Sequence, residues 1–253
     1  MSRLAVDLAR ALDPVQLASG IGMDPDPWQA EVLRTDHPRL LLNCCRQSGK
    51  STTSAVKATH VAVYEPGSLT LLLSPSLRQS QEVFRKVTAV YRSLGRPVPS
   101  ESENALSLTL ENGSRIVSLP GTEGTIRSFS AVRLLVVDEA SRVPDETIAA
   151  VRPMLAVSGG QLVALSTPWG RRGWWFEAWE NGGAVWKRVR VPASECPRIS
   201  PTFLAEERAA LGEWFYRQEY DCAFAETSAQ LFTEEHLRAM YDARVRPLFP
   251  TGA

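Results

Sequence analysis

The chain has 253 residues, of which 44% are hydrophobic, and its 28 basic and 28 acidic residues cancel to a formal net charge of zero. A chain of this length can bury the core of one large domain, or of one domain with a small satellite. The sequence has no apolar stretch long enough to cross a bilayer and no signal-peptide pattern at its start, so we expect a cytosolic protein without membrane contact. The balanced charge excludes a global basic field for holding nucleic acid.

The cysteines Cys44, Cys45, Cys196 and Cys222 form no C-x-x-C pair, and only three histidines accompany them. This pattern disfavours a zinc site. We expect Cys44 and Cys45 to pack as small hydrophobic residues where the first strand ends.

The first motif in chain order is Asp26-Pro27-Trp28-Gln29, within a segment of about residues 24–35. A glutamine amide can pair with both the donor and the acceptor edge of adenine, and an aromatic ring can stack on a base. Trp28 and Gln29 are therefore candidate adenine-binding residues, although an isolated motif of this kind is weak.

The second motif is a phosphate-binding loop. An apolar strand is predicted over residues 39–43, Gln47-Ser48-Gly49-Lys50-Ser51 follows, and a helix is predicted over 51–64. In such a loop the backbone N–H groups hold phosphate oxygens, the lysine reaches the outer phosphates and the Ser51 hydroxyl can bind Mg²⁺. An ordinary strand-to-helix turn would not explain why Lys50 and Arg46 bracket Gly49.

This loop departs from the standard pattern at two positions. Cys44 occupies the place of the first glycine, and Arg46 adds a second cation beside the phosphates. Arg46 is therefore a candidate phosphate-binding and γ-phosphate-sensing residue.

The middle of the chain predicts a strand over 69–73, a helix over 77–94 and a β-hairpin over 105–119 that turns at Asn112-Gly113. The glycine-rich loop that follows carries Arg127. This arginine could stabilise transition-state charge in its own subunit or a neighbour's, or be a solvated loop residue.

A buried strand predicted over 134–137 runs into Asp138-Glu139. Carboxylates at the tip of such a strand are costly unless they have a partner or a task. Asp138 fits a residue that organises Mg²⁺, and Glu139 fits the residue that polarises the attacking water. A helix near 145–155 follows, and an N-cap for that helix is the simpler alternative.

The last predicted strand, 161–165, ends in Ser166-Thr167-Pro168. Its two hydroxyl groups could sense the γ-phosphate, although a plain strand-to-turn ending explains them equally well. A tryptophan cluster then occupies 169–186, where core packing or a subunit interface is favoured over base stacking. Its members are Trp169, Trp174, Trp175, Trp179 and Trp186.

Alternation of apolar runs and helices predicts an α/β fold: a mostly parallel sheet with helices on both faces. Ligands of such sheets bind at the carboxyl ends of the strands, where the polar motifs lie. We expect this core over 1–190 and a small α-rich region over 191–253, with helical stretches at 202–211 and 213–221 and another from Thr233.

Taken together, these motifs resemble the ATPase domain of the large terminase subunit, the motor that packages double-stranded DNA in tailed bacteriophages and related viruses. The similarity covers roughly residues 24–235 and rests on five motifs in order. They are Trp28-Gln29, Arg46 to Ser51, Gly124 to Arg127 ahead of the acidic strand, Ser166-Thr167-Pro168, and 215–222, which is similar to the family's lid region.

This resemblance implies a RecA-like, ASCE-type P-loop ATPase core with a C-terminal lid, using ATP and Mg²⁺. It also implies action in the host cytoplasm as a homo-oligomeric ring, a pentamer by analogy, that contacts double-stranded DNA, the portal and the small terminase subunit. Arg127 would then complete a neighbour's site, and Ser166 and Thr167 would couple hydrolysis to movement.

Two departures from the family qualify the expectation. Ser128 replaces the glycine that often follows the loop arginine, and no RNase H-like nuclease domain follows within the 253 residues, so we expect no nuclease activity from them. Two other functions stay open: a helicase-type DNA-stimulated ATPase, which normally needs two such cores, and a non-catalytic, ATP-dependent assembly module.

Overall fold

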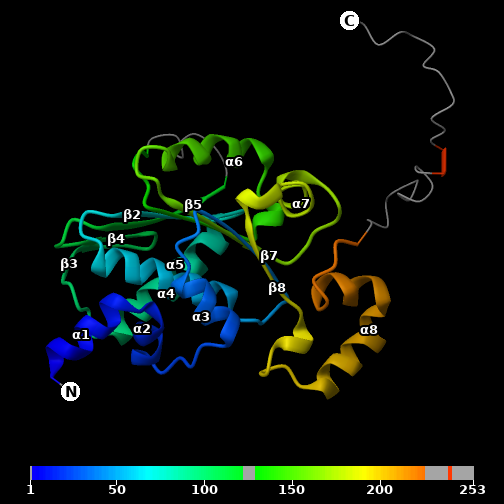
Figure 1. Cartoon of the computed structure of the whole chain (residues 1–253), viewed down its shortest axis with the longest axis horizontal. Coiled ribbons are helices and arrows are strands. Elements are labelled where there is room, and N and C mark those ends of the chain that lie inside the picture. Colours follow the sequence, from blue (N-terminus) through cyan, green and yellow to red (C-terminus); the bar gives the residue numbers. More distant parts are fainter. Residues whose placement is uncertain (1, 122–128, 226–238, 241–253) are drawn as a thin grey trace, which may run out of the picture.

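The centre of the computed structural model, which describes residues 2–121, 129–225 and 239–240, is an eight-stranded sheet (Figure 1). The strand order is β3-β4-β5-β2-β6-β7-β1-β8. Neighbours from β5 to β8 run parallel, and β3, β4 and β5 pair antiparallel, which confirms the predicted mostly parallel sheet. The strands are β1 (Arg39–Cys44), β2 (Leu69–Ser74), β3 (Ser100–Glu103), β4 (Ser107–Leu110), β5 (Arg115–Pro120), β6 (Leu134–Asp138), β7 (Gln161–Ser166) and β8 (Lys187–Val191).

Helices cover both faces of this sheet (Figure 1). Helices α1 to α5 lie on one side, and α6 and α7 lie on the other. The helices are α1 (Arg3–Leu12), α2 (Pro14–Gly20), α3 (Pro27–Arg34), α4 (Lys50–Tyr64), α5 (Leu77–Ser93), α6 (Asp145–Val151), α7 (Gly173–Glu180) and α8 (Pro201–Glu219), with short 3-10 turns η2 (Ala140–Arg142), η3 (Arg152–Leu155), η4 (Gly183–Val185) and η5 (Ala193–Glu195).

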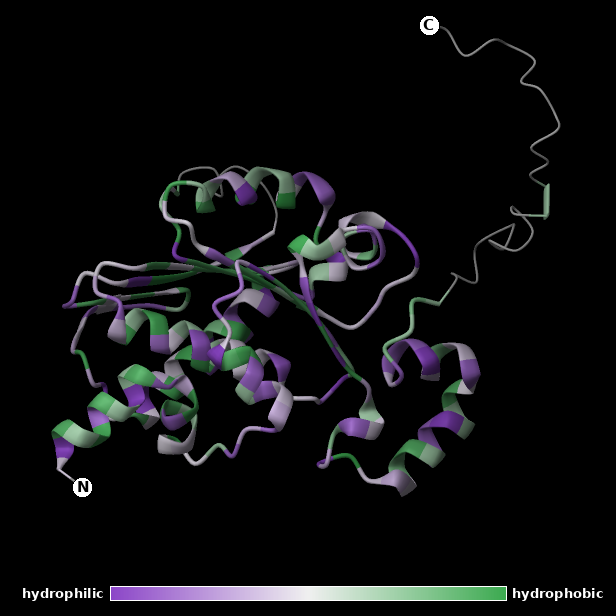
Figure 2. Cartoon of the chain, in the orientation of Figure 1, coloured by the Kyte–Doolittle hydropathy of each residue, from purple (hydrophilic) through white to green (hydrophobic). Residues whose placement is uncertain are grey.

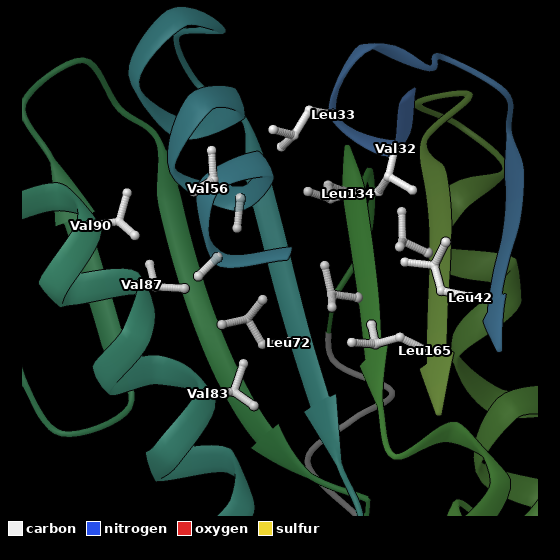
Figure 3. Close-up of a cluster of buried hydrophobic side chains, with 14 of the residues drawn as sticks. Val32, Leu33, Leu42, Val56, Leu72, Val83, Val87, Val90, Leu134 and Leu165 are labelled. Atoms are coloured by element: carbon white, nitrogen blue, oxygen red, sulfur yellow. The ribbon is translucent and has the colours of Figure 1, made fainter. Parts of the chain in front are cut away.

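The central strands are hydrophobic along their length because both of their faces are covered (Figure 2). In β1, Leu40 and Leu42 join the core beneath α3, α4 and α5, whereas Leu41 joins the core beneath α6 and α7. Side chains of α3, α4 and α5 meet those of β1, β2, β6 and β7 in the first of these cores (Figure 3). Since full burial of one leucine contributes roughly 1.5–3 kcal/mol, these two layers fix the positions of the strand ends.

Strand β7 lies between β1 and β6, so three polar strand ends meet at one edge of the sheet. Asn43 of β1 pairs with Ser166 of β7, and Leu165 of β7 pairs with Asp138 of β6. The phosphate loop, the Ser-Thr turn and the acidic pair are therefore neighbours, as parallel topology requires.

The hairpin between β4 and β5 turns at Asn112-Gly113, where Gly113 has a φ of 81°. The Asn112 amide also donates hydrogen bonds to the carbonyls of Ala62 and Val63, so the turn caps the end of α4. The predicted hairpin is confirmed.

After β8, the described residues form the 3-10 turn η5 and the helix α8. Helix α8 is divided at Gly212, whose φ of 75° and ψ of 161° are not helical, and this agrees with two helical stretches. The run predicted from Thr233 lies outside the described residues, and the domain boundary at residue 190 stays a prediction. In the described part of the chain, no helix combines the length and apolar character needed to span a bilayer.

Candidate active site

The phosphate loop connects β1 to α4 through two residues with left-handed backbone conformations. Gln47 has a φ of 61° and Gly49 a φ of 91°. A Cβ on Gly49 would lie 2.7 Å from the Gln29 amide nitrogen. The backbone conformation thus requires glycine at position 49, and any side chain there would also displace the Gln29 amide.

Lys50 opens α4 with its side chain almost buried, at 7% exposure. Its ammonium group lies 3.5 Å from the Cys45 carbonyl oxygen. The first N–H groups of an α-helix lack partners within the helix and attract anions. A buried ammonium beside these N–H groups makes the start of α4 suited to phosphate oxygens.

Cys44 and Cys45 are both fully buried, as expected of small hydrophobic residues. Burial raises the pKa of the Cys44 thiol, which therefore stays neutral. Cys45 Sγ lies 3.6 Å from Cys196 Sγ. Within the described residues, no three His, Cys, Asp or Glu side chains gather as a metal-binding group.

Asp138 ends β6 facing the phosphate loop. Its carboxylate oxygens lie 3.4 and 3.5 Å from Ser51 Oγ, so the two predicted Mg²⁺ ligands are neighbours. Burial, together with the charge of Glu139, raises the pKa of Asp138 to about 6, against the opposing influence of Lys50 and Lys86. A buried carboxylate beside a hydroxyl is an oxygen donor set that fits Mg²⁺.

Glu139 has a left-handed backbone, with φ 49° and ψ 44°, and it lines the cavity in front of the phosphate loop. A residue with a Cβ in this conformation is strained by roughly 1–3 kcal/mol. This left-handed conformation turns the chain sharply after β6, and the turn places the Glu139 side chain at the cavity.

The Ser-Thr turn joins the acidic turn to the phosphate-loop strand. Ser166 Oγ lies 2.7 Å from Ser141 Oγ and accepts a hydrogen bond from the Ser141 N–H. The Thr167 hydroxyl donates to the carbonyl of Cys44. Ser141, two residues after Glu139, is a site residue that the sequence analysis missed.

These elements enclose a cavity of about 610 Å³. Of the predicted residues, it is lined by Arg46, Gln47, Ser48, Gly49, Lys50, Ser51, Glu139 and Thr167. Lys86 of α5 and Arg142 of η2 also reach it, and the Arg142 guanidinium lies 3.9 Å from the centre of the Trp169 ring. No sequence signal separates these two cations from ordinary surface residues.

Arg46 contacts the end of α8. Its Nε donates to the Glu219 carboxylate at 2.5 Å, and its backbone N–H donates to the Glu219 carbonyl. The Arg46 side chain is 64% exposed, so the guanidinium lies at the mouth of the cavity.

Trp28 and Gln29 lie behind the loop. Gln29 is 2% exposed, its side-chain oxygen accepts from the Asp26 N–H, and its amide nitrogen approaches Gly49. Trp28 packs half-buried against the core, and neither residue is among those lining the cavity. Their contact with adenine stays a prediction.

Arg198 binds both the start of α3 and the phosphate loop, and the sequence analysis did not predict this role. Its guanidinium makes two hydrogen bonds to the Asp26 carboxylate, at 2.9 and 2.6 Å. It also donates to the Ser48 carbonyl at 2.9 Å. Arg198 thus links the start of α3 to the phosphate loop from 150 residues away.

The tryptophan cluster contributes to the core. Trp175 and Trp186 are 1% and 8% exposed within the core beneath α6 and α7, and Trp174 donates to the Val143 carbonyl. Arg127 lies outside the described residues.

Comparison with known families is consistent with this geometry. The family described as "Terminase large subunit, T4likevirus-type, N-terminal" matches residues 41–239. The large terminase subunits of Thermus phage G20c and Thermus virus P23-45 are each 26% identical to the chain over 219 residues. The match covers 79% of this chain but only 45% of each relative, so the chain spans less than half their length.

Solved structures share the fold. The large terminase ATPase domain of Thermus phage P74-26 superposes with a TM-score of 0.72 at 21% identity, covering 82% of this chain and 97% of that domain. The large terminase of a thermophilic bacteriophage, solved in complex with ADP, superposes with a TM-score of 0.66 at 11% identity, covering 79% and 54%. The latter protein was also solved with ATP-γ-S.

Proposed function

The chain belongs to the N-terminal family of T4-type large terminase subunits, and from this premise we propose that it is the ATP-hydrolysing motor domain that drives double-stranded DNA into a viral capsid. The observation that carries the proposal is that Lys50, Ser51 and Glu139 line one cavity. The Asp138 carboxylate lies 3.4 Å from the Ser51 hydroxyl. Hydrolysis of a phosphoanhydride needs this combination of phosphate cradle, metal ligands and base.

The residues at the phosphate end of the site each have a task in this proposal. Lys50, Arg46 and the N–H groups of 47–49 would hold the phosphates. Ser51 and Asp138 would hold Mg²⁺, which when bound would neutralise phosphate charge. Glu139 accepts the proton of the attacking water. Complexes of a similar terminase with ADP and ATP-γ-S support ATP as the nucleotide. Catalysis then consists mainly of positioning and electrostatic stabilisation.

The hydrogen bonds behind Glu139 supply a route for coupling. A change at Glu139 reaches Ser141 and, through its hydroxyl, Ser166. From the adjacent Thr167 it reaches the end of β1 at Cys44. These contacts support a role for the Ser-Thr turn in transmitting the state of the γ-phosphate to the phosphate-loop strand.

The partners follow from family membership. We propose action as a homo-oligomeric ring, a pentamer by analogy, that works on double-stranded DNA with the portal and the small terminase subunit in the host cytoplasm. In that ring Arg127 would reach the neighbouring subunit's cavity.

Mixing two inactive variants tests this assembly. Arg127→Ala keeps an intact phosphate loop, and Lys50→Ala keeps an intact arginine, so a mixed interface combines both. We expect the mixture to hydrolyse ATP although neither variant does alone, as measured by phosphate release. Each variant at the same total concentration is the control, and a mixture that stays inactive at every ratio, although the subunits associate, would contradict action across the interface.

A further inference from the structure

Two cysteine thiols meet beside the phosphate loop, and the proposed hydrolysis uses neither of them. Cys45, the first residue after β1, has its Sγ 3.6 Å from the Sγ of Cys196, which is 151 positions away in the sequence. Both residues are buried, at 0% and 2% exposure. Two thiols in contact need only a short movement to form a disulfide, so this pair is a candidate modification site.

Backbone hydrogen bonds fix where both sulfurs lie. The Cys45 N–H donates to the carbonyl of Val191, the last residue of β8, at 3.0 Å. Beyond β8, the Cys196 N–H donates to the Ala193 carbonyl at 3.1 Å, and the Cys196 carbonyl accepts from the Ile199 N–H at 3.0 Å. Cys45 is thus bonded to the end of β8 and Cys196 lies in the turn that follows, so the thiol contact is part of the fold.

The two sulfurs differ in their readiness to ionise. The hydrogen bond from the Cys45 thiol and the positive charge of Arg198 lower the pKa of Cys196, against the opposing influence of burial. The same hydrogen bond, together with burial, raises the pKa of Cys45. Cys196 is therefore the sulfur that becomes a thiolate more readily, and Cys45 stays a neutral thiol beside it. A reactive thiolate next to a second, resolving thiol is the usual arrangement of cysteines that oxidise reversibly.

Both cysteines are joined to groups that hold the phosphate loop. The Cys45 carbonyl oxygen lies 3.5 Å from the Lys50 ammonium. Two residues after Cys196, Arg198 donates to the Ser48 carbonyl at 2.9 Å. A disulfide has a sulfur–sulfur distance of about 2.05 Å, so closing it from 3.6 Å requires the two sulfurs to approach by roughly 1.5 Å. That movement acts on Lys50 from one side and on Ser48 from the other.

We propose that Cys45 and Cys196 are a site of reversible oxidation, and that the disulfide between them stops ATP turnover by displacing Lys50 from its place at the phosphates. The existence of the site depends only on the thiol contact, whereas its effect on turnover rests on the proposed ATPase function. The oxidant class is a small hydroperoxide, because a molecule of nearly the size of water reaches buried sulfurs that a bulky disulfide does not.

Hydrogen peroxide balances the reaction. The Cys196 thiolate attacks one peroxide oxygen, the O–O bond breaks, and hydroxide leaves and is protonated to water, which gives a sulfenic acid at Cys196. The Cys45 thiol then attacks the Cys196 sulfur, so that the S–S bond forms, the S–O bond breaks and a second water leaves. In total two thiols lose two electrons and two protons, and one peroxide is reduced to two waters. Dithiothreitol reverses the modification by thiol–disulfide exchange.

Peptide mapping of the wild-type chain tests the site independently of ATP. The full chain is treated with hydrogen peroxide, its remaining thiols are alkylated, and it is digested with trypsin without reduction. We expect a disulfide-linked pair of the peptides 40–46 and 191–198, in which fragment sequencing places the link at Cys45 rather than Cys44. The linked pair should be absent from untreated protein and from protein reduced again with dithiothreitol.

ATP turnover by the same samples tests the consequence of the link. We expect oxidation to lower the rate of phosphate release by about 100-fold, the loss that a displacement of about 1 Å causes at an active site, and dithiothreitol to restore the rate. Cys196→Ser should hydrolyse ATP at the wild-type rate and keep that rate after peroxide. The matched control is Cys222→Ser, because Cys222 is equally buried but its thiol donates to the Val191 carbonyl. This variant should lose activity on oxidation as the wild type does.

Three results would overturn the inference. No link between the two peptides, or a link through Cys44 or Cys222, would mean that the thiol contact is not a modification site. A disulfide between Cys45 and Cys196 with unchanged turnover would show that the link does not act on the phosphate loop. Loss of activity by peroxide-treated Cys196→Ser would assign the loss to other residues.

The two readouts keep the failure of this inference apart from the failure of the proposed function. If Cys196→Ser does not fold, the peptide map of the wild type still decides whether the site exists. A wild type that forms the link but does not hydrolyse ATP in its reduced form would contradict the proposed ATPase function and leave the oxidation site standing.

Discussion

Replacing Glu139 with glutamine is expected to lower the rate of ATP hydrolysis by about 10²- to 10⁴-fold, the usual effect of removing a general base. Glutamine keeps the size of the side chain but cannot accept the proton of the attacking water. ATP binding should persist, because the phosphate contacts come from the loop and from Lys50 rather than from Glu139. The rate is measured as phosphate release, and binding is measured by calorimetry.

The control for this variant is Glu146→Gln in the first turn of α6, which removes an exposed carboxylate close in sequence but outside the set that lines the cavity. That protein should hydrolyse ATP at the wild-type rate. Normal turnover by Glu139→Gln would remove Glu139 from the mechanism.

Replacing Asp138 with asparagine should have opposite effects on stability and activity. The pKa of Asp138 is raised to about 6 in the folded protein, from 3.8 for an unperturbed carboxyl. Above pH 6 the ionised carboxylate therefore lowers the free energy of unfolding by roughly 1–3 kcal/mol. The lower end of this range allows for the favourable interactions with Ser51 and Lys50 that asparagine would lose. Asparagine removes this cost, and it also removes the metal ligand, so turnover should be lost.

The pH dependence of the free energy of unfolding tests the direction of this effect. In the wild type, the folded state binds more protons than the unfolded state between pH 3.8 and about 6, so the free energy of unfolding falls as pH rises through that window. The stability advantage of Asp138→Asn should thus be small near pH 4.5, grow up to about pH 6 and then stay constant.

Urea unfolding without nucleotide or Mg²⁺ measures this difference, with Asp24→Asn as a control because Asp24 is exposed. An Asp138→Asn protein less stable than the wild type at pH 8 would show that the carboxylate is satisfied in the empty site.

Much of the fold could be predicted because the central strands are buried on both faces. Such strands are continuous apolar runs, as in residues 134–137 of β6, and parallel topology then brings their polar ends together. The turn at Asn112-Gly113 and the break of α8 at Gly212 also depend on local residue chemistry, which a sequence displays.

Two strands were not predicted, because contacts with the rest of the sheet stabilise them although their sequences lack a strand-like hydrophobic pattern. Strand β3 is Ser-Glu-Ser-Glu, and β8 carries three cations in five residues. Both are edge strands, which need no apolar face of their own. No helix was predicted over α1 or α2 either.

In the site, too, residues that belong to local sequence motifs could be predicted, whereas residues that act through long-range contacts could not. Lys50, Ser51, Asp138 and Glu139 form local motifs and could be assigned by spacing. Arg198 acts through Asp26, 172 residues away. Contacts of this kind join distant segments of the chain and leave no local pattern in the sequence.

Steady-state ATP hydrolysis per subunit, followed over a wide range of protein concentration in the presence of Mg²⁺, tests the central claim most directly. A ring motor whose subunits complete one another's sites predicts activity per subunit that rises with concentration and levels off as the subunits associate, with Lys50→Ala inactive throughout. Activity per subunit that is the same at all concentrations would indicate a solitary catalytic core, and no hydrolysis at any concentration would leave only nucleotide-dependent assembly. Either result would contradict the ring motor.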